Sequence, residues 1–169
     1  IMALQLKLFP QGPNVPVPSL RFGFCGAAPL AAETWKQFED TFGIRVYQGY
    51  GLTETTCWAV SSPPAGEHRH DSVGVPLEGV QIRIAVAEVG DVESFDFESS
   101  KTGTSTGEVL IKGAIVGPGY YKNQKLTKES MTDDGFFRTG DLGYFDADGY
   151  LHISGRLKEV IIKNGANVF

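Results

Sequence analysis

The sequence has few cysteines, no excess of positive charge and no long apolar run. Its two cysteines, Cys25 and Cys57, form no CxxC pair, so they do not predict a zinc cluster, and we expect reduced thiols in a cytoplasmic protein. The net charge of -5 argues against a nucleic-acid partner, because nucleic-acid sites are usually basic. No run approaches the ~18 apolar residues of a transmembrane helix, and no charged-then-apolar leader predicts secretion.

What is present is typical of a folded globular protein. Hydrophobic residues make up 41% of the 169, a length that fits one domain, or one domain with parts of others. The chain starts with Ile1 and stops within an apolar, strand-like segment at Phe169. We therefore expect an internal fragment of a longer protein.

The first third has an α/β pattern. Residues 1–9 are typical of an apolar helix, and residues 20–25 and 44–48 are short apolar segments typical of buried strands. Between the strands, aromatic residues recur at helical spacing from Pro29, which suits the first helical position, to Gly43, which suits a helix end. The order strand–turn–helix–strand predicts a parallel pair of strands.

The remainder has an antiparallel β pattern. Residues 80–86 alternate between apolar and other side chains, as in a strand with one buried face. Residues 88–106 are acidic and then rich in Ser, Thr and Gly, which predicts an exposed hairpin excursion. Further short strands are expected at residues 108–112, 136–138, 144–145 and 150–154, with a short helix at 126–131.

Three motifs offer chemistry, although each alone is also compatible with an ordinary turn. In Gly49-Tyr50-Gly51-Leu52-Thr53-Glu54, glycines allow close backbone approach, the Tyr offers a flat aromatic face, and the Glu is a hard ligand for Mg²⁺. Residues 137–141 end in Thr-Gly-Asp, whose carboxylate could accept two ribose hydroxyls. Residues 154–165 place an Arg and a Lys at an expected break between two strands.

In this order, the segments resemble the adenylate-forming superfamily of acyl-CoA synthetases, peptide-synthetase adenylation domains and luciferases. The resemblance runs from about residue 20 to the end. It is carried by Gly26-Ala27-Ala28-Pro29-Leu30, Gly49-Tyr50-Gly51-Leu52-Thr53-Glu54, Ser72-Val73-Gly74-Val75-Pro76, Gly107-Glu108-Val109-Leu110-Ile111-Lys112-Gly113, Arg138-Thr139-Gly140-Asp141 and Gly155-Arg156-Leu157-Lys158-Glu159-Val160-Ile161-Ile162.

The resemblance implies a fold and its boundaries. We expect α/β plus antiparallel β: residues 1–72 as part of the N-terminal α/β subdomain and residues 73–155 as a small β-barrel subdomain. Residues 156–169 would be the hinge and the first segment of a C-terminal domain.

The resemblance also implies roles for individual residues. Those assigned to the adenosine moiety are Gly26, Ala27 and Ala28 beside the adenine, Tyr50 and Gly51 at the base, and Asp141 and Arg156 at the ribose. Thr53 would contact the AMP phosphate, Glu54 would bind Mg²⁺, and Lys158 would be the hinge residue.

The activity implied is that of an ATP-dependent acid–thiol ligase. Its substrates would be a carboxylic acid, ATP and coenzyme A, with Mg²⁺. The alternatives are a domain that loads a carrier-protein pantetheine and a non-catalytic nucleotide-binding module. Residues 10–25 contain no acidic side chain to hold a substrate amine, which favours simple acids over amino acids.

Two parts of the family's machinery are missing from this sequence. No Ser/Thr/Gly-rich phosphate loop precedes residue 20, and the family's C-terminal catalytic lysine would lie beyond residue 169. We therefore expect that the chain does not catalyse the reaction alone.

Two further features carry weaker hypotheses. His68 and His70 would share one side of a strand, but the neighbouring prolines predict a loop, and a metal site needs three or four ligands. Trp58 follows Glu54 by four residues, so a helix there would place the two on one face, near the acyl pocket of the family.

Overall fold

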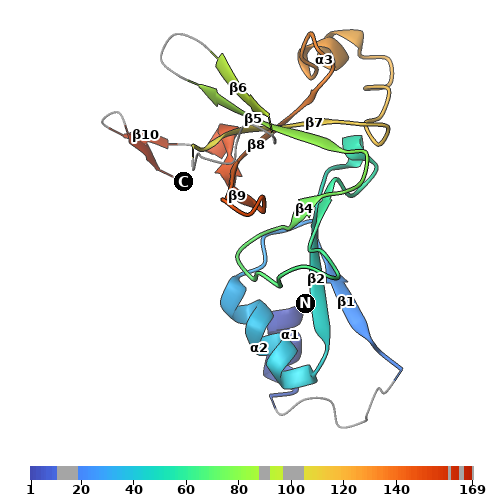
Figure 1. The fold of residues 1–169 in the computed structure, drawn as a ribbon, viewed down its shortest axis with the longest axis vertical. Coiled ribbons are helices and arrows are strands. Elements are labelled where there is room, and N and C mark those ends of the chain that lie inside the picture. Colours follow the sequence, from blue (N-terminus) through green and yellow to red (C-terminus); the bar gives the residue numbers. More distant parts are fainter. Residues whose placement is uncertain (11–18, 88–91, 97–104, 160, 164–165, 169) are drawn as a thin grey trace.

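The computed structural model describes residues 1–10, 19–87, 92–96, 105–159, 161–163 and 166–168, which form two main sheets with helices at each end (Figure 1). In chain order the elements are α1 (Met2–Leu8), β1 (Phe22–Cys25), α2 (Ala32–Phe42), β2 (Arg45–Tyr50), a 3-10 turn (Thr53–Thr55), β3 (Val60–Ser61), β4 (Val75–Pro76), β5 (Gln81–Ala87), β6 (Val92–Asp96), β7 (Gly107–Lys112), α3 (Gln124–Glu129), β8 (Phe137–Phe145), β9 (Leu151–Arg156), a 3-10 turn (Leu157–Glu159), β10 (Ile161–Lys163) and β11 (Ala166–Val168).

The first sheet contains the expected parallel pair. β1 and β2 run parallel, with Phe22 opposite Arg45, and α2 connects them. The predicted stop is confirmed, because Gly43 has a left-handed φ of 66° at the end of α2. The predicted start is wrong: α2 begins at Ala32, because Leu30 instead packs inward against the core beneath the helix.

Trp35 is the centre of that core. Its side chain is fully buried, and its indole Nε1 donates a hydrogen bond to the Val46 carbonyl, 3.1 Å away. Leu6 of α1 and Phe38 of α2 complete the buried cluster. The indole therefore links α2 to β2, the strand that leads to the candidate site.

The second sheet is antiparallel and has the order β6-β5-β7-β8-β9. Among the described strands it is open, since β6 and β9 do not pair, so the expected closed barrel is not observed. Of the 88–106 excursion, the structure describes β6, which pairs with β5, and residues 105–106; residues 88–91 and 97–104 lie outside the described part.

One strand, β8, replaces the two expected at residues 136–138 and 144–145. Glycine at position 140 takes a left-handed φ of 70°, and the registers with β7 and β9 shift nearby. The strand bends at the Thr-Gly-Asp sequence through these irregularities. The hydrogen-bonded pairing of β8 with its neighbours therefore continues on both sides of the bend.

The two sheets share a core and meet at a crossing where Gly74 and Leu151 form a β-bridge. Val73 donates its N–H to the Leu151 carbonyl, and Leu151 donates its own to the Gly74 carbonyl, at 3.0 and 2.8 Å. Val60 of the first sheet and Ile111 of the second, both fully buried, belong to one apolar cluster around this crossing.

Asp146 anchors the turn between β8 and β9. Its carboxylate accepts hydrogen bonds from Arg69, at 2.6 Å, and from the backbone N–H of Tyr150, and it lies 2.9 Å from His152 Nε2. Burial acts to raise the pKa of Asp146, but these partners outweigh burial and hold it below its usual value.

Asp146 should therefore stabilise the fold in a pH-dependent manner. A lowered folded-state pKa gives stability that is complete above the unfolded pKa of about 4 and is lost as the pH falls through the folded value. Asp146→Asn should lower the free energy of unfolding by about 1–2 kcal/mol at pH 7. Urea denaturation should show the difference shrinking towards pH 3, whereas Asp133→Asn, at an exposed turn position, should change little at either pH. A difference independent of pH would contradict the assignment.

Candidate functional site

A hollow of about 990 Å³ opens where the end of the first sheet meets β8 and β9. Four segments that are distant in the sequence line it. They contribute Phe24, Cys25, Gly26 and Ala27; Gly49, Gly51, Leu52, Thr53, Glu54, Thr56, Cys57 and Trp58; Thr139 and Gly140; and Arg156 and Lys158.

The loop after β2 forms a tight turn rather than the helix that would put Glu54 and Trp58 on one face. Only Thr53–Thr55 is helical, in a single 3-10 turn. The Thr55 hydroxyl bonds both the N–H and the carbonyl of Leu52, which closes the turn, and Thr56 and Cys57 then take left-handed conformations. Trp58 is consequently placed by this turn and not by helical spacing from Glu54.

Two glycines allow this loop to fold against its neighbours. A Cβ on Gly51 would lie 2.1 Å from the Cys57 carbonyl oxygen, and one on Gly49 would lie 2.8 Å from the Trp58 ring. Any side chain there would force the backbone or the indole to move. The glycines of the motif are thus needed for packing within the protein.

Asp141 connects the Tyr50 motif to the Arg156 motif through its carboxylate. Its Oδ2 accepts a hydrogen bond from the Tyr50 hydroxyl at 2.8 Å, and its Oδ1 accepts one from Arg156 Nε at 2.9 Å. Arg156 lies directly opposite Asp141 in the β8–β9 ladder. Burial, together with the charge of Asp141, raises the pKa of Tyr50, so its hydroxyl remains a donor.

Glu54 is held at the edge of the hollow by a residue that the sequence did not indicate. Its Oε1 accepts a hydrogen bond from the Tyr120 hydroxyl at 2.8 Å, and its backbone carbonyl accepts one from Gly117 N–H. The same hydrogen bond raises the pKa of Tyr120. Among the described residues Oε2 has no hydrogen-bond partner, which leaves one carboxylate oxygen for a cation.

The structure brings most of the predicted residues together. Those that line the hollow are Gly26, Ala27, Gly51, Thr53, Glu54, Arg156 and Lys158, whereas Ala28, Tyr50 and Asp141 do not line it. Asp141 is buried directly behind Thr139 and Gly140, which do.

Phe24, Thr139 and Tyr120 are the site residues that sequence reasoning missed. Phe24 packs edge-on against Trp58 with ring centroids 4.9 Å apart, and Thr139 accepts the Asp141 N–H. Phe24 lies two residues before the Gly26–Leu30 motif, and Thr139 lies within the Arg138–Asp141 motif, so their positions in the sequence could have indicated them. Tyr120 is 66 residues from Glu54, and only the fold joins them.

The arrangement combines a flat apolar wall, a buried carboxylate, an exposed hydroxyl and both signs of charge. Phe24, Trp58 and the glycines supply apolar and backbone surface. Glu54, Arg156 and Lys158, which also line the hollow, supply charges of both signs. Such a set suits a planar base, a ribose and a phosphate with its cation.

Comparison with known proteins defines the class. Residues 2–121 match the family described as AMP-binding enzyme. The chain belongs to this family.

Particular relatives are CoA ligases. The chain is 42% identical over 150 residues to sulfoacetate–CoA ligase of Cupriavidus necator, covering 88% of this chain and 28% of that protein. ATP-bound MatB of Rhodopseudomonas palustris is similar in structure, with a TM-score of 0.79 and 32% identity over 99% of this chain and 32% of that one. MenE of Bacillus subtilis, an O-succinylbenzoate CoA synthetase solved with ATP and magnesium, has a TM-score of 0.77 and 28% identity, over 98% of this chain and 32% of its own.

The chain thus spans about a third or less of the relatives that it matches. In the described part of the chain, no helix is both long enough and apolar enough to cross a membrane.

Proposed function

We propose that this chain is the adenosine-binding part of an ATP-dependent acid–CoA ligase. The observation that carries the proposal is the convergence of Gly26, Glu54, Thr139 and Arg156 on one hollow, from segments up to 130 residues apart (156 − 26). The CoA ligases among the relatives support the same reaction class.

In this proposal the hollow receives AMP. The adenine lies against the backbone of Gly26 and Ala27 and beside Tyr50, and the ribose hydroxyls reach Asp141 and Arg156. Support comes from the position of Asp141 next to Thr139 and Gly140 in the hollow's wall. Each of its carboxylate oxygens accepts one hydrogen bond from the described residues and can accept more than one.

Thr53 and Glu54 would bind the phosphate groups of the nucleotide and their Mg²⁺ ion. Thr53 is exposed at the hollow and offers a hydroxyl donor to a phosphate oxygen. The free Oε2 of Glu54 suits Mg²⁺, which prefers oxygen ligands and would neutralise phosphate charge when bound. Tyr120 would keep this carboxylate in place.

The chemistry would proceed in two steps. A carboxylate oxygen of the acid attacks the α-phosphorus of ATP, the bond to pyrophosphate breaks, and acyl-AMP forms. The thiol sulfur of coenzyme A then attacks the acyl carbon, the carbon–oxygen bond to AMP breaks, and the thiol proton is released. Activation is required because the negative charge of a carboxylate repels nucleophiles.

The proposal also assigns the parts of the chain. Residues 1–72 belong to an α/β subdomain, residues 73–155 to a β subdomain that the rest of the protein could close into a barrel, and residues 156–169 to a hinge and the next domain. Lys158 would act at the hinge. By itself the chain is expected to bind nucleotide without completing the reaction.

Calorimetric titration of the chain with AMP, and with ATP in the presence and absence of Mg²⁺, tests this function. We expect saturable binding of both nucleotides, with ATP bound more tightly when Mg²⁺ is present. Glu54→Gln should abolish the effect of Mg²⁺ on ATP binding and leave AMP binding within about twofold, because AMP needs no cation bridge. Glu78→Gln, an exposed carboxylate outside the hollow, is the matched control. A folded chain that binds neither nucleotide would refute the proposal.

A further inference from the structure

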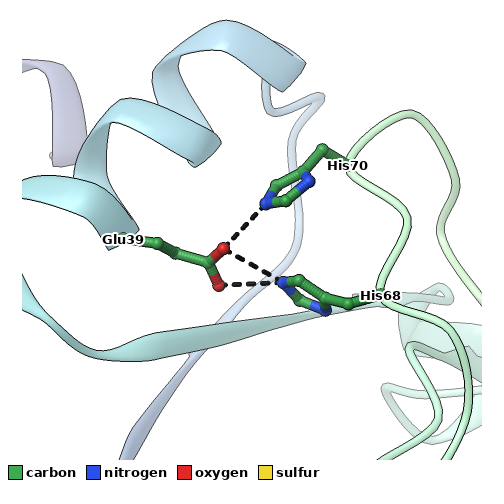
Figure 2. A group of neighbouring side chains, drawn as sticks. All are labelled: Glu39, His68 and His70. Atoms are coloured by element: carbon green, nitrogen blue, oxygen red, sulfur yellow. Dashed lines mark hydrogen bonds and ion pairs between the residues drawn. The ribbon is translucent and has the colours of Figure 1, made fainter.

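Two imidazoles and a carboxylate converge beside α2, away from the nucleotide hollow. Figure 2 shows the Nε2 atoms of both histidines directed at the carboxylate of Glu39. His68 Nε2 lies 2.9 and 3.1 Å from the two carboxylate oxygens, and His70 Nε2 lies 2.7 Å from Oε2. The three ligand atoms all lie within 4.8 Å of one another.

The fold builds this trio from two separate segments. Glu39 comes from the C-terminal half of α2 and is fixed by the Val46 N–H, which donates to Oε1 at 2.5 Å. The histidines come from the connection between β3 and β4, with one residue between them. The intervening Arg69 bonds Glu67, Asp146 and Asp148, so its side chain is occupied elsewhere.

The imidazole rings are held in place before any ligand arrives. Trp35 contacts both of them edge-on, with centroids 5.3 Å from His68 and 4.9 Å from His70. The exposed fraction is 11% for the His68 side chain, 14% for Glu39 and 27% for His70. A preorganised and mostly buried set of ligands loses little side-chain entropy when it binds an ion.

We propose that Glu39, His68 and His70 bind one divalent transition-metal ion of the zinc class. Two histidines and one carboxylate form a donor set that zinc uses, with the fourth position left to water. Zinc lies about 2.0–2.2 Å from such ligands, which places neighbouring ligand atoms about 3.3 Å apart in a tetrahedron. The observed 2.7–3.1 Å separations need to open by only about 0.2–0.6 Å to admit the ion.

Binding would replace the ring protons that now lie between Nε2 and the carboxylate. Each neutral imidazole would then carry its proton on Nδ1. For His68 this nitrogen is buried and has no partner among the described residues, so the ring lacks the outer acceptor that usually supports a metal-bound histidine. Loss of such an acceptor typically costs about 10–100-fold in affinity, and we therefore expect micromolar rather than nanomolar binding.

The ion would fasten the β3–β4 connection to α2. None of its three ligands lines the nucleotide hollow, so the inference does not depend on the proposed ligase activity. An ion that binds only the folded state stabilises it by mass action, and the melting temperature should rise with zinc concentration.

Trp35 provides a specific readout, because its ring touches both imidazoles. In a Cys57→Ser, Trp58→Phe background, the exposed thiol is removed and Trp35 is the only tryptophan. Co²⁺ bound by the trio should quench Trp35 fluorescence with a stoichiometry of one per chain, and Zn²⁺ should compete for the site. Calorimetry with Zn²⁺ alone measures the affinity.

Substitutions of the ligands decide the outcome. Glu39→Gln and His70→Gln should each weaken Zn²⁺ binding at least tenfold and abolish the zinc-dependent rise in melting temperature. Glu33→Gln, an exposed position on the same helix, and His152→Gln, whose ring bonds Asp146 alone among carboxylates, should bind as the parent does. If Glu39→Gln does not fold, the more exposed His70 position decides. Absence of stoichiometric quenching, or binding unaffected by His70→Gln, would show that the trio is only a hydrogen-bonded cluster.

Discussion

Replacing Asp141 with Ala should weaken AMP binding by at least about 100-fold. In the proposed complex the Asp141 carboxylate accepts the ribose hydroxyls, and hydrogen bonds to a charged group contribute about 1.5–3 kcal/mol each. Two such bonds exceed the ~2.7 kcal/mol that corresponds to a factor of 100. Asp141→Asn, which keeps one acceptor oxygen, should give an intermediate loss. Calorimetric titration with AMP measures both effects.

Tyr50→Phe is the control that separates an effect of Asp141→Ala on AMP binding from an effect on folding. Asp141→Ala also deprives the Tyr50 hydroxyl of its acceptor, and an unsatisfied polar group of this kind costs about 1–3 kcal/mol of stability. Tyr50→Phe removes the same hydrogen bond but retains the carboxylate, so it should keep AMP binding within about tenfold. Equal losses of affinity in Tyr50→Phe and Asp141→Ala would indicate a structural effect. Unchanged affinity in Asp141→Ala would contradict the placement of the ribose.

Replacing Gly74 with Ala should destabilise the protein by more than about 4 kcal/mol, an exceptional loss for one methyl group. Gly74 has a φ of 104°, and a Cβ there would lie 2.0 Å from the Ser61 carbonyl oxygen and 2.3 Å from the Ser62 nitrogen. Both obstacles are backbone atoms, so no side-chain rotation can relieve them. The crossing of the two sheets, where Leu151 donates to the Gly74 carbonyl, should open.

Gly79 is the natural control for Gly74. Its φ of 76° is also left-handed, but a Cβ there would meet nothing within 4 Å. Gly79→Ala should therefore cost only the conformational penalty of about 1–2 kcal/mol. Urea denaturation of both variants measures the loss in the free energy of unfolding that each substitution causes. A Gly74→Ala protein as stable as Gly79→Ala would show that the crossing tolerates a side chain.

The local pattern of this sequence was enough to predict several elements and the family. Period-two alternation predicted β5, and aromatic spacing with Gly43 predicted the body and end of α2, because periodicity and backbone preference act within a few residues. The order of short motifs predicted the family, which the family match confirmed. The roles of the individual motif residues stay predictions.

Other local predictions failed where contacts from elsewhere in the chain compete. The helix that would have placed Trp58 on one face with Glu54 does not form, because the Thr55 hydroxyl closes a single turn and Gly51 packs on Cys57. The Thr-Gly-Asp bend lies within a continuous strand, because β7 and β9 pair on both sides of it. Register and pairing involve distant partners, so no short window of sequence contains them.

The sequence by itself determined the kinds of groups available: the glycines, hydroxyls, carboxylates and cations of the short motifs, and a His-x-His pair. Tertiary structure alone decided which groups meet. It placed Arg156 opposite Asp141, Tyr120 against Glu54, and Glu39 between two histidines some thirty residues later in the chain. The physical reason is that a site is defined by distances of about 3 Å, whereas sequence separation constrains distance only over the few residues of one helix or strand.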